Sequence, residues 1–162
     1  MEVRIYYEDT DAAGVVYHAN YLKYFERART EYFRAHGLSV TELASDGFVF
    51  PVVRVEMDFR APAVHDDLLS MRTYPVQLSG SSFVMRQQAV RQSDGRLLVD
   101  ALITLACVGP GLKARRIPVV ARRLLEEELA AGNGRDTARE HAEVCAGEPR
   151  MPAGEKAGWE VR

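Results

Sequence analysis

The chain lacks the features that mark a secreted, membrane or nucleic-acid-binding protein. Among its 162 residues only Cys107 and Cys145 are cysteines, too few for a disulfide framework, so we expect reduced thiols and a cytoplasmic protein. The formal net charge is −2, which gives no reason to expect a nucleic-acid partner. No apolar run approaches the roughly 18 residues that a membrane span needs, and the N-terminus shows no export signal.

Most catalytic motifs are absent as well. No serine lies in a G-x-S-x-G context, no cysteine lies near a plausible base, and nothing matches a P-loop or a dinucleotide fingerprint. The four histidines are scattered, so we expect no metal centre. The segment that starts at Asp9 begins like an EF-hand calcium loop. However, its fifth position is Ala13, and its twelfth is Asn20 where a bidentate glutamate belongs.

The apolar periodicity that is present predicts an α+β domain over residues 1–131. A short strand over 3–7 and a loop over 9–14 precede a long helix over 19–36, which Gly37 ends. Period-two alternation and turn residues then predict four strands and a closing helix, over 48–59, 68–77, 82–91, 97–108 and 118–131. One apolar helix followed by antiparallel strands favours a sheet wrapped around that helix.

Two expectations concern the chain's periphery. From Gly132 onward large apolar residues almost vanish, so residues 132–162 are predicted to form a mobile polar tail, with at most a transient helix near 138–145. The open edges of the sheet favour pairing with a second copy, so we expect a homodimer.

The segment between the first strand and the long helix is the strongest candidate for a reactive site. An Asp-x-Asp loop is ordinarily a pair of Asx turns. Here Gly14 permits a tight bend and the helix begins soon afterwards, so its positive end should lie near the Asp11 carboxylate. The backbone N–H of His18 has no partner within the helix and could polarise a carbonyl oxygen. The His18 side chain is a candidate cap or packing group, and the alternative is that it hydrogen-bonds a substrate or orients Asp11.

A carboxylate and a helix N-terminus are only two catalytic groups, and they are best suited to cleaving a thioester bond. A thiol leaving group has a pKa of about 8.5, so a thioester breaks without strong acid assistance. Asp11 would either attack the carbonyl, giving a mixed anhydride, or take a proton from water. The sequence leaves both routes open.

The run from Tyr7 to Tyr21, YEDTDAAGVVYHANY, followed by FERARTE at 25–31, closely resembles the YbgC-like acyl-CoA thioesterases of the 4-hydroxybenzoyl-CoA thioesterase group. The resemblance covers about residues 1 to 130. It implies a hotdog fold, with a long central helix wrapped by an antiparallel sheet, and dimers or tetramers with active sites at the subunit interface. It also implies that Asp11 is the catalytic carboxylate, that the His18 N–H polarises the thioester carbonyl, and that Tyr7 lines the site.

By the same resemblance, the basic turn of Lys113, Arg115 and Arg116 meets the CoA phosphates, a solvated surface loop being the alternative. The expected activity is hydrolysis of an acyl-CoA, or of an acyl-carrier-protein thioester, with no cofactor beyond the CoA of the substrate. A non-catalytic acyl-binding hotdog protein is the alternative function.

Four phenylalanines are candidates for the acyl pocket, although ordinary core positions are favoured: Phe48, Phe50, Phe59 and Phe83.

Overall fold

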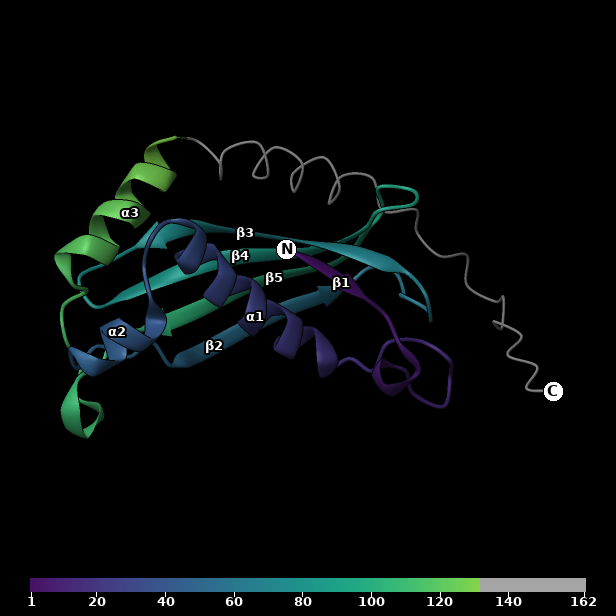
Figure 1. The fold of residues 1–162 in the computed structure, drawn as a ribbon, viewed down its shortest axis with the longest axis horizontal. Coiled ribbons are helices and arrows are strands. Elements are labelled where there is room, and N and C mark those ends of the chain that lie inside the picture. Colours follow the sequence, from purple (N-terminus) through teal and green to yellow (C-terminus); the bar gives the residue numbers. More distant parts are fainter. Residues whose placement is uncertain (132–162) are drawn as a thin grey trace, which may run out of the picture.

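The computed structural model describes residues 1–131, so the predicted tail over 132–162 lies outside the described residues. The described part is an α+β domain in which one long helix lies against an antiparallel sheet (Figure 1). Its helices are α1 (Asn20–Ala35), α2 (Val40–Ser45) and α3 (Val119–Ala130). Its strands are β1 (Glu2–Arg4), β2 (Val52–Phe59), β3 (Leu68–Leu78), β4 (Ser82–Arg91) and β5 (Leu97–Ala106). Two 3-10 turns cover Tyr7–Asp9 and Pro110–Leu112.

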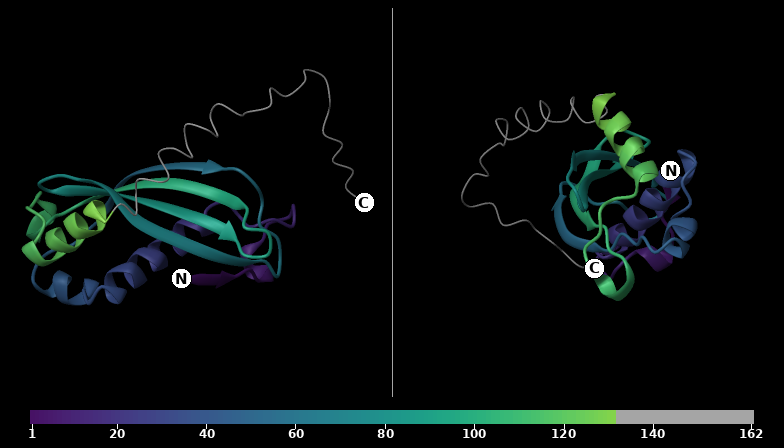
Figure 2. Two further views of the ribbon diagram at one scale, coloured as in Figure 1. Left: turned by 90° about the horizontal axis from the view of Figure 1, so that it is seen from above. Right: turned by 90° about the vertical axis from the view of Figure 1, so that its left-hand side faces the viewer.

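The five strands form one sheet in the order β1-β3-β4-β5-β2, and every pair within it is antiparallel. The strands β1 and β2 are therefore its edges. Figure 2 shows α1 running along one side of this sheet, with α3 beside one end of it. The arrangement is the predicted hotdog-like architecture of a central helix and a wrapping sheet.

The core lies between α1 and the inner face of the sheet. From the helix it takes buried aromatic and small side chains, among them Tyr21, Phe25, Ala28 and Phe33. From the sheet it takes alternate residues of β4 and β5, such as Phe83, Met85, Ala89, Val99 and Ile103. Burying one large apolar side chain contributes about 1.5–3 kcal/mol, so this layer is what holds the helix on the sheet.

Most predicted elements are confirmed, with shifts that have local causes. The long helix differs by one residue at each end, and the strand over 82–91 coincides with β4. The first strand ends at Arg4 rather than at residue 7, because the Tyr6 N–H bonds the Asp9 carboxylate and starts a 3-10 turn. The strand predicted from residue 48 begins at Val52, since Val49 makes only an isolated bridge to Val108. The short helix α2 was not predicted.

One side-chain prediction needs correction, the one for the phenylalanines. Phe83 is ordinary core as favoured, whereas Phe59 is 53% exposed at the end of the edge strand β2. Val53 and Val55 on the same strand are exposed too, because no further strand covers this edge.

Cys107 is a free, buried thiol, and no helix within residues 1–131 is both long and apolar enough to cross a membrane.

Candidate active site

The loop before α1 folds as a tight hairpin. Thr10 pairs with Val16, and the Asp11 N–H donates to the Val15 carbonyl at 2.9 Å. Gly14 makes the reversal with a φ of 75°, which other residues adopt only with strain. The Val16 N–H donates to the Ala63 carbonyl at 2.9 Å, which fixes the hairpin to the connection between β2 and β3.

Asp9 is the structural centre of this hairpin. Its carboxylate accepts hydrogen bonds from the Tyr24 hydroxyl at 2.6 Å and from the Tyr6 N–H at 2.9 Å. Its backbone carbonyl accepts from the Tyr17 N–H and from the Asn20 side-chain amide. Burial, together with the Asp9 carboxylate, raises the pKa of Tyr24, so its hydroxyl stays protonated and remains a donor. Asp9 therefore ties the hairpin to α1.

Asp11 is bound far more loosely, although it is only two residues away. Its side chain is exposed, and Oδ1 accepts one hydrogen bond, from the Ala13 N–H at 2.8 Å. This is the Asx-turn contact that such loops commonly make. Within residues 1–131, Oδ2 accepts no hydrogen bond. One oxygen thus orients the carboxylate and the other is left for a ligand or water.

The N-terminus of α1 lacks a side-chain cap. Its N-cap residue is Ala19, and no acidic residue lies in the first turn. Within the described part of the chain, the backbone N–H groups of His18 and Ala19 donate to no acceptor. Free N–H groups at a helix N-terminus carry partial positive charge and bind developing negative charge. The predicted donor at His18 is therefore available.

Aromatic rings surround this helix start. The His18 ring lies 4.4 Å from the ring of Tyr17 and 6.4 Å from that of Phe59, as measured between centroids. Tyr7 is exposed and stacks on His65 at 4.0 Å, which places it over the β2–β3 connection. Phe59 is one of the four phenylalanines that the sequence offered as pocket candidates, whereas His65 was not predicted, because it lies outside the motif around Asp11.

The basic turn lies at the other end of the sheet from this hairpin (Figure 1). It follows the end of β5 that pairs with Val52, whereas the hairpin is fixed next to the end of β2 at Phe59. Arg115 is already engaged: its guanidinium lies 3.7 Å above the Phe48 ring and donates to the Gly47 carbonyl at 3.0 Å. The structure thus separates all three predicted phosphate ligands from Asp11 within one copy, and Arg115 already contacts the chain itself.

Arg116 has a different environment. It lines a pocket of about 700 Å³ together with Arg115 and Arg122, over apolar side chains that include Phe48 and Ile117. Within residues 1–131 the Arg116 guanidinium has no hydrogen-bond or ion-pair partner, and neither has the exposed ammonium of Lys113, which does not line the pocket.

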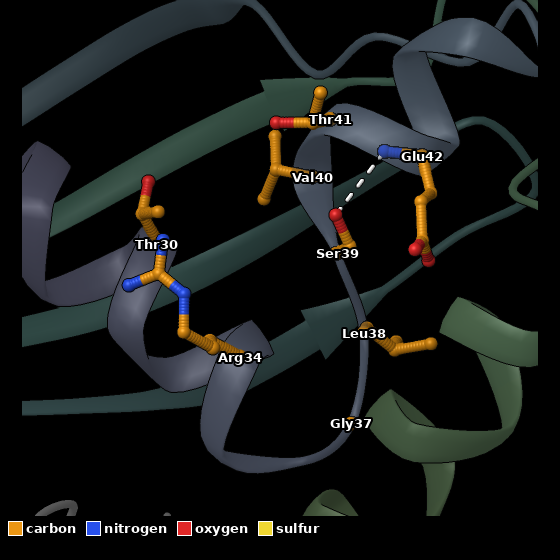
Figure 3. A pocket seen from close by; sticks show the side chains of 8 residues that line it. All are labelled: Thr30, Arg34, Gly37, Leu38, Ser39, Val40, Thr41 and Glu42. Atoms are coloured by element: carbon orange, nitrogen blue, oxygen red, sulfur yellow. Dashed lines mark hydrogen bonds between the residues drawn. The ribbon is translucent and has the colours of Figure 1, made fainter.

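A second pocket, of about 300 Å³, lies between the end of α1 and the start of α2 (Figure 3). Two of its polar side chains already have partners: Ser39 Oγ accepts from the Glu42 N–H at 3.2 Å, and Arg34 pairs with Glu31. Among residues 1–131, no group of three His, Cys, Asp or Glu side chains could hold a metal ion. The hairpin and the start of α1 remain the strongest candidate site.

The fold and this motif define a hotdog-type thioesterase, and comparison with known proteins agrees. Residues 13–98 match the family model of the thioesterase superfamily, and the chain belongs to this superfamily. The chain is 42% identical to the acyl-CoA thioester hydrolase YbgC of Escherichia coli O6:H1 over 117 residues, which cover 72% of this chain and 87% of that protein.

Two further relatives place the chain in the same group. The acyl-CoA thioesterase YbgC of Haemophilus influenzae is 42% identical over 110 residues, covering 67% of this chain and 79% of its own. The crystal structure of a 1,4-dihydroxy-2-naphthoyl-CoA thioesterase from Synechocystis superposes with a TM-score of 0.72 at 28% identity, covering 77% of this chain and 93% of that one. The resemblance predicted from the sequence is confirmed.

Proposed function

We propose that this thioesterase hydrolyses acyl-CoA at the hairpin and the N-terminus of α1, with Asp11 as the reacting carboxylate. The observation that carries the proposal is that one short segment holds both a free carboxylate oxygen and free backbone N–H donors. Asp11 keeps one free oxygen, and the helix start that follows it keeps two free N–H donors. Structural loops normally satisfy such groups internally, so their joint availability in one short segment fits a binding site for a reacting carbonyl.

The reaction follows from these groups. The thioester oxygen accepts from the His18 N–H, a donor that is typically worth about 2.7–4 kcal/mol at the transition state. Asp11 either bonds to the carbonyl carbon or takes a proton from the attacking water. In both routes the C–S bond breaks and CoA leaves as a thiolate that solvent protonates; on direct attack, water then hydrolyses the mixed anhydride, which frees the acid and regenerates Asp11. Rapid-quench mass spectrometry distinguishes them, because only direct attack leaves an acyl group on Asp11.

A second copy is required to bring the basic turn to this site. The β2 edge exposes backbone and apolar side chains, including Val53, Val55 and Phe59. If two β2 strands pair about a twofold axis, they run antiparallel, so the Val52 end of one copy lies beside the Phe59 end of the other. The basic turn of one copy then approaches the hairpin of its partner. We therefore assign the CoA phosphates to a site contributed across the dimer, with Tyr7 and His65 forming part of its wall.

Arg116 is the best phosphate ligand of the three predicted basic residues. Its guanidinium is free, and it lines the pocket that Arg122 also lines. Arg115 instead holds the segment around Gly47 and shapes the pocket. Lys113 is exposed and adds positive charge nearby. Arginine forks suit phosphate because they offer two parallel N–H donors.

A thiol-release assay tests the proposal and its alternatives. The native protein should release CoA catalytically from some members of a panel of short, medium, long and aromatic acyl-CoAs. An acyl-carrier-protein thioester in the same assay tests the second substrate class. Binding of acyl-CoA by calorimetry without any thiol release would favour the non-catalytic acyl-binding function. Sedimentation should give a dimer or tetramer, and a monomer with full activity would contradict the shared site.

A further inference from the structure

Arg29 is a buried cation that makes no ion pair within the described residues, and only the Glu26 carboxylate acts on it, from beyond ion-pair distance. It lies in α1 and is only 9% exposed. Its Nη1 donates to Gln87 Oε1 at 2.7 Å, and no carboxylate of residues 1–131 lies within 4 Å of its guanidinium. Arginine keeps its charge even though burial lowers the pKa of Arg29. A buried charge without a contacting opposite charge is costly, so its retention calls for an explanation.

The neighbouring Gln87 is arranged to serve Arg29. Gln87 is fully buried, and its amide nitrogen donates to the Phe25 carbonyl and to Thr73 Oγ1, both at 2.9 Å. These two bonds direct the amide oxygen toward Arg29. Because a single neutral acceptor satisfies one of the five N–H donors of a guanidinium, the remaining donors suit a further acceptor.

The sheet register places this pair close to the proposed reaction centre. Gln87 lies opposite Ala101, and Ala101 lies opposite Met57 at the β2 edge, so the three side chains share the inner face. The next inner row ends at Phe59, whose ring lies 6.4 Å from that of His18. Inner rows are two residues apart, or about 7 Å. Gln87 is therefore one inner row along the strands from Phe59 and two strands, or about 10 Å, across the sheet from it.

The surface between these points is apolar and open along the edge strand. Its sheet side has the small residue Ala101 and the half-exposed Val55 and Phe59. Its helix side has Leu22, which lies two turns before Arg29 on the same flank of α1 and is 43% exposed. An acyl group whose carbonyl sits on the His18 N–H would extend over this strip, and a second copy at β2 would cover it.

From these contacts we infer that Arg29 determines specificity by binding an acceptor oxygen at the far end of the acyl group, and that the favoured substrates are acyl-CoAs with a terminal carboxylate. The inference rests on the proposed function. A carboxylate supplies both a negative charge in direct contact and two acceptors that match the guanidinium fork. An alkyl end would leave the Arg29 donors unpaired, which disfavours it.

Matched substrates test this inference. Adipoyl-CoA and hexanoyl-CoA have the same chain length and differ only at the far end. We expect native kcat/KM to be at least tenfold higher for adipoyl-CoA, and we expect Arg29→Met to lower that ratio at least tenfold. Arg27→Met is the control, because Arg27 is an exposed arginine of the same helix and its loss should leave the ratio unchanged. Succinyl-CoA and suberyl-CoA, each with its alkyl counterpart, locate the length optimum.

The outcomes separate this inference from the proposed function. If the ratio of kcat/KM for adipoyl-CoA to that for hexanoyl-CoA is the same in the native protein and in Arg29→Met, the role of Arg29 is overturned and the thioesterase proposal stands. Failure of the native protein on every thioester would overturn the proposed function itself. If Arg29→Met does not fold, Arg29→Lys keeps the charge but loses the fork. It should retain a reduced preference for adipoyl-CoA, and a preference equal to or above the native one would contradict carboxylate binding by the guanidinium.

Discussion

The N-termini of α1 and α2 are built differently. The start of α2 has the hydrogen bonding of a structural turn, whereas the start of α1 has the free donors of a binding site. At α2, Ser39 accepts a hydrogen bond from the Glu42 N–H, as an ordinary N-cap does (Figure 3). At α1 the N-cap is Ala19, no side chain caps the helix, and the preceding N–H groups are free. A folded chain usually satisfies such groups itself, so leaving them free in the segment that also carries the exposed Asp11 carboxylate favours function rather than stability.

The same contrast divides the two aspartates of the hairpin. Asp9 accepts two hydrogen bonds through its side chain and connects the hairpin to Tyr24 of α1. Asp11 makes one short-range contact and is exposed. Loss of Asp9 should therefore affect the fold first, and loss of Asp11 should affect the reaction first.

The largest expected effect is that of Asp11→Asn on turnover. The amide cannot act as nucleophile or base, so kcat should fall by about 10³-fold, within the range typical of a lost general base. The melting temperature should change little, because only the contact with the Ala13 N–H is altered. Steady-state kinetics and thermal unfolding measure the two quantities. Parental turnover in this variant would rule out both proposed routes.

Asp9→Ala should act in the opposite sense, mainly on stability. It removes two charge-assisted acceptors, and we expect a loss of about 2–4 kcal/mol in the free energy of unfolding. Tyr24→Phe removes only one of these bonds and should cost about 1–2 kcal/mol. Urea unfolding measures both. A stability of Asp9→Ala equal to that of the parent would mean that the hairpin is not held by this carboxylate.

The basic end of the molecule provides a smaller contrast of the same kind. Arg116→Ala should raise KM for acyl-CoA about five- to tenfold without loss of stability, because its free guanidinium is the proposed phosphate ligand. Arg115→Ala should instead lower stability by about 1 kcal/mol, since it removes the contacts with Phe48 and Gly47. Equal KM values for Arg116→Ala and the parent would remove Arg116 from the site.

Ser39→Ala gives the smallest effect and serves as the reference for a purely structural helix start. Removing the cap should cost about 1 kcal/mol of stability and leave kcat/KM unchanged. Differential scanning calorimetry with parallel kinetics checks both parts. A marked loss of activity would show that α2 contributes to the site after all.

Much of this architecture is predictable from the sequence because the periodic signals are strong. The long helix and β4 follow directly from apolar spacing, and the family motif around Asp11 gave the fold. The short helix α2 has too few residues for a period, and its only local signal is the cap at Ser39. The exposure of Phe59 depends on β2 being an edge strand, which no local pattern encodes.

The candidate site was only partly predictable for a similar reason. The motif indicated Asp11 and His18. The different roles of Asp9, which is structural, and Asp11, which is exposed, depend on the hydrogen bond from Tyr24, which lies 15 residues after Asp9. The distance of the basic turn from the hairpin follows from strand order, and the Arg29–Gln87 contact joins residues 58 positions apart. Such long-range contacts have no signature in a single sequence.

A crystal structure with a ketone analogue of acyl-CoA, in which a methylene group replaces the thioester sulfur, tests the central claim most directly. The account predicts that the ketone oxygen lies about 3 Å from the His18 nitrogen and that an Asp11 carboxylate oxygen, or one water bound to it, lies about 3–3.5 Å from the carbonyl carbon. A ketone bound away from the start of α1, with Asp11 still facing solvent, would contradict it.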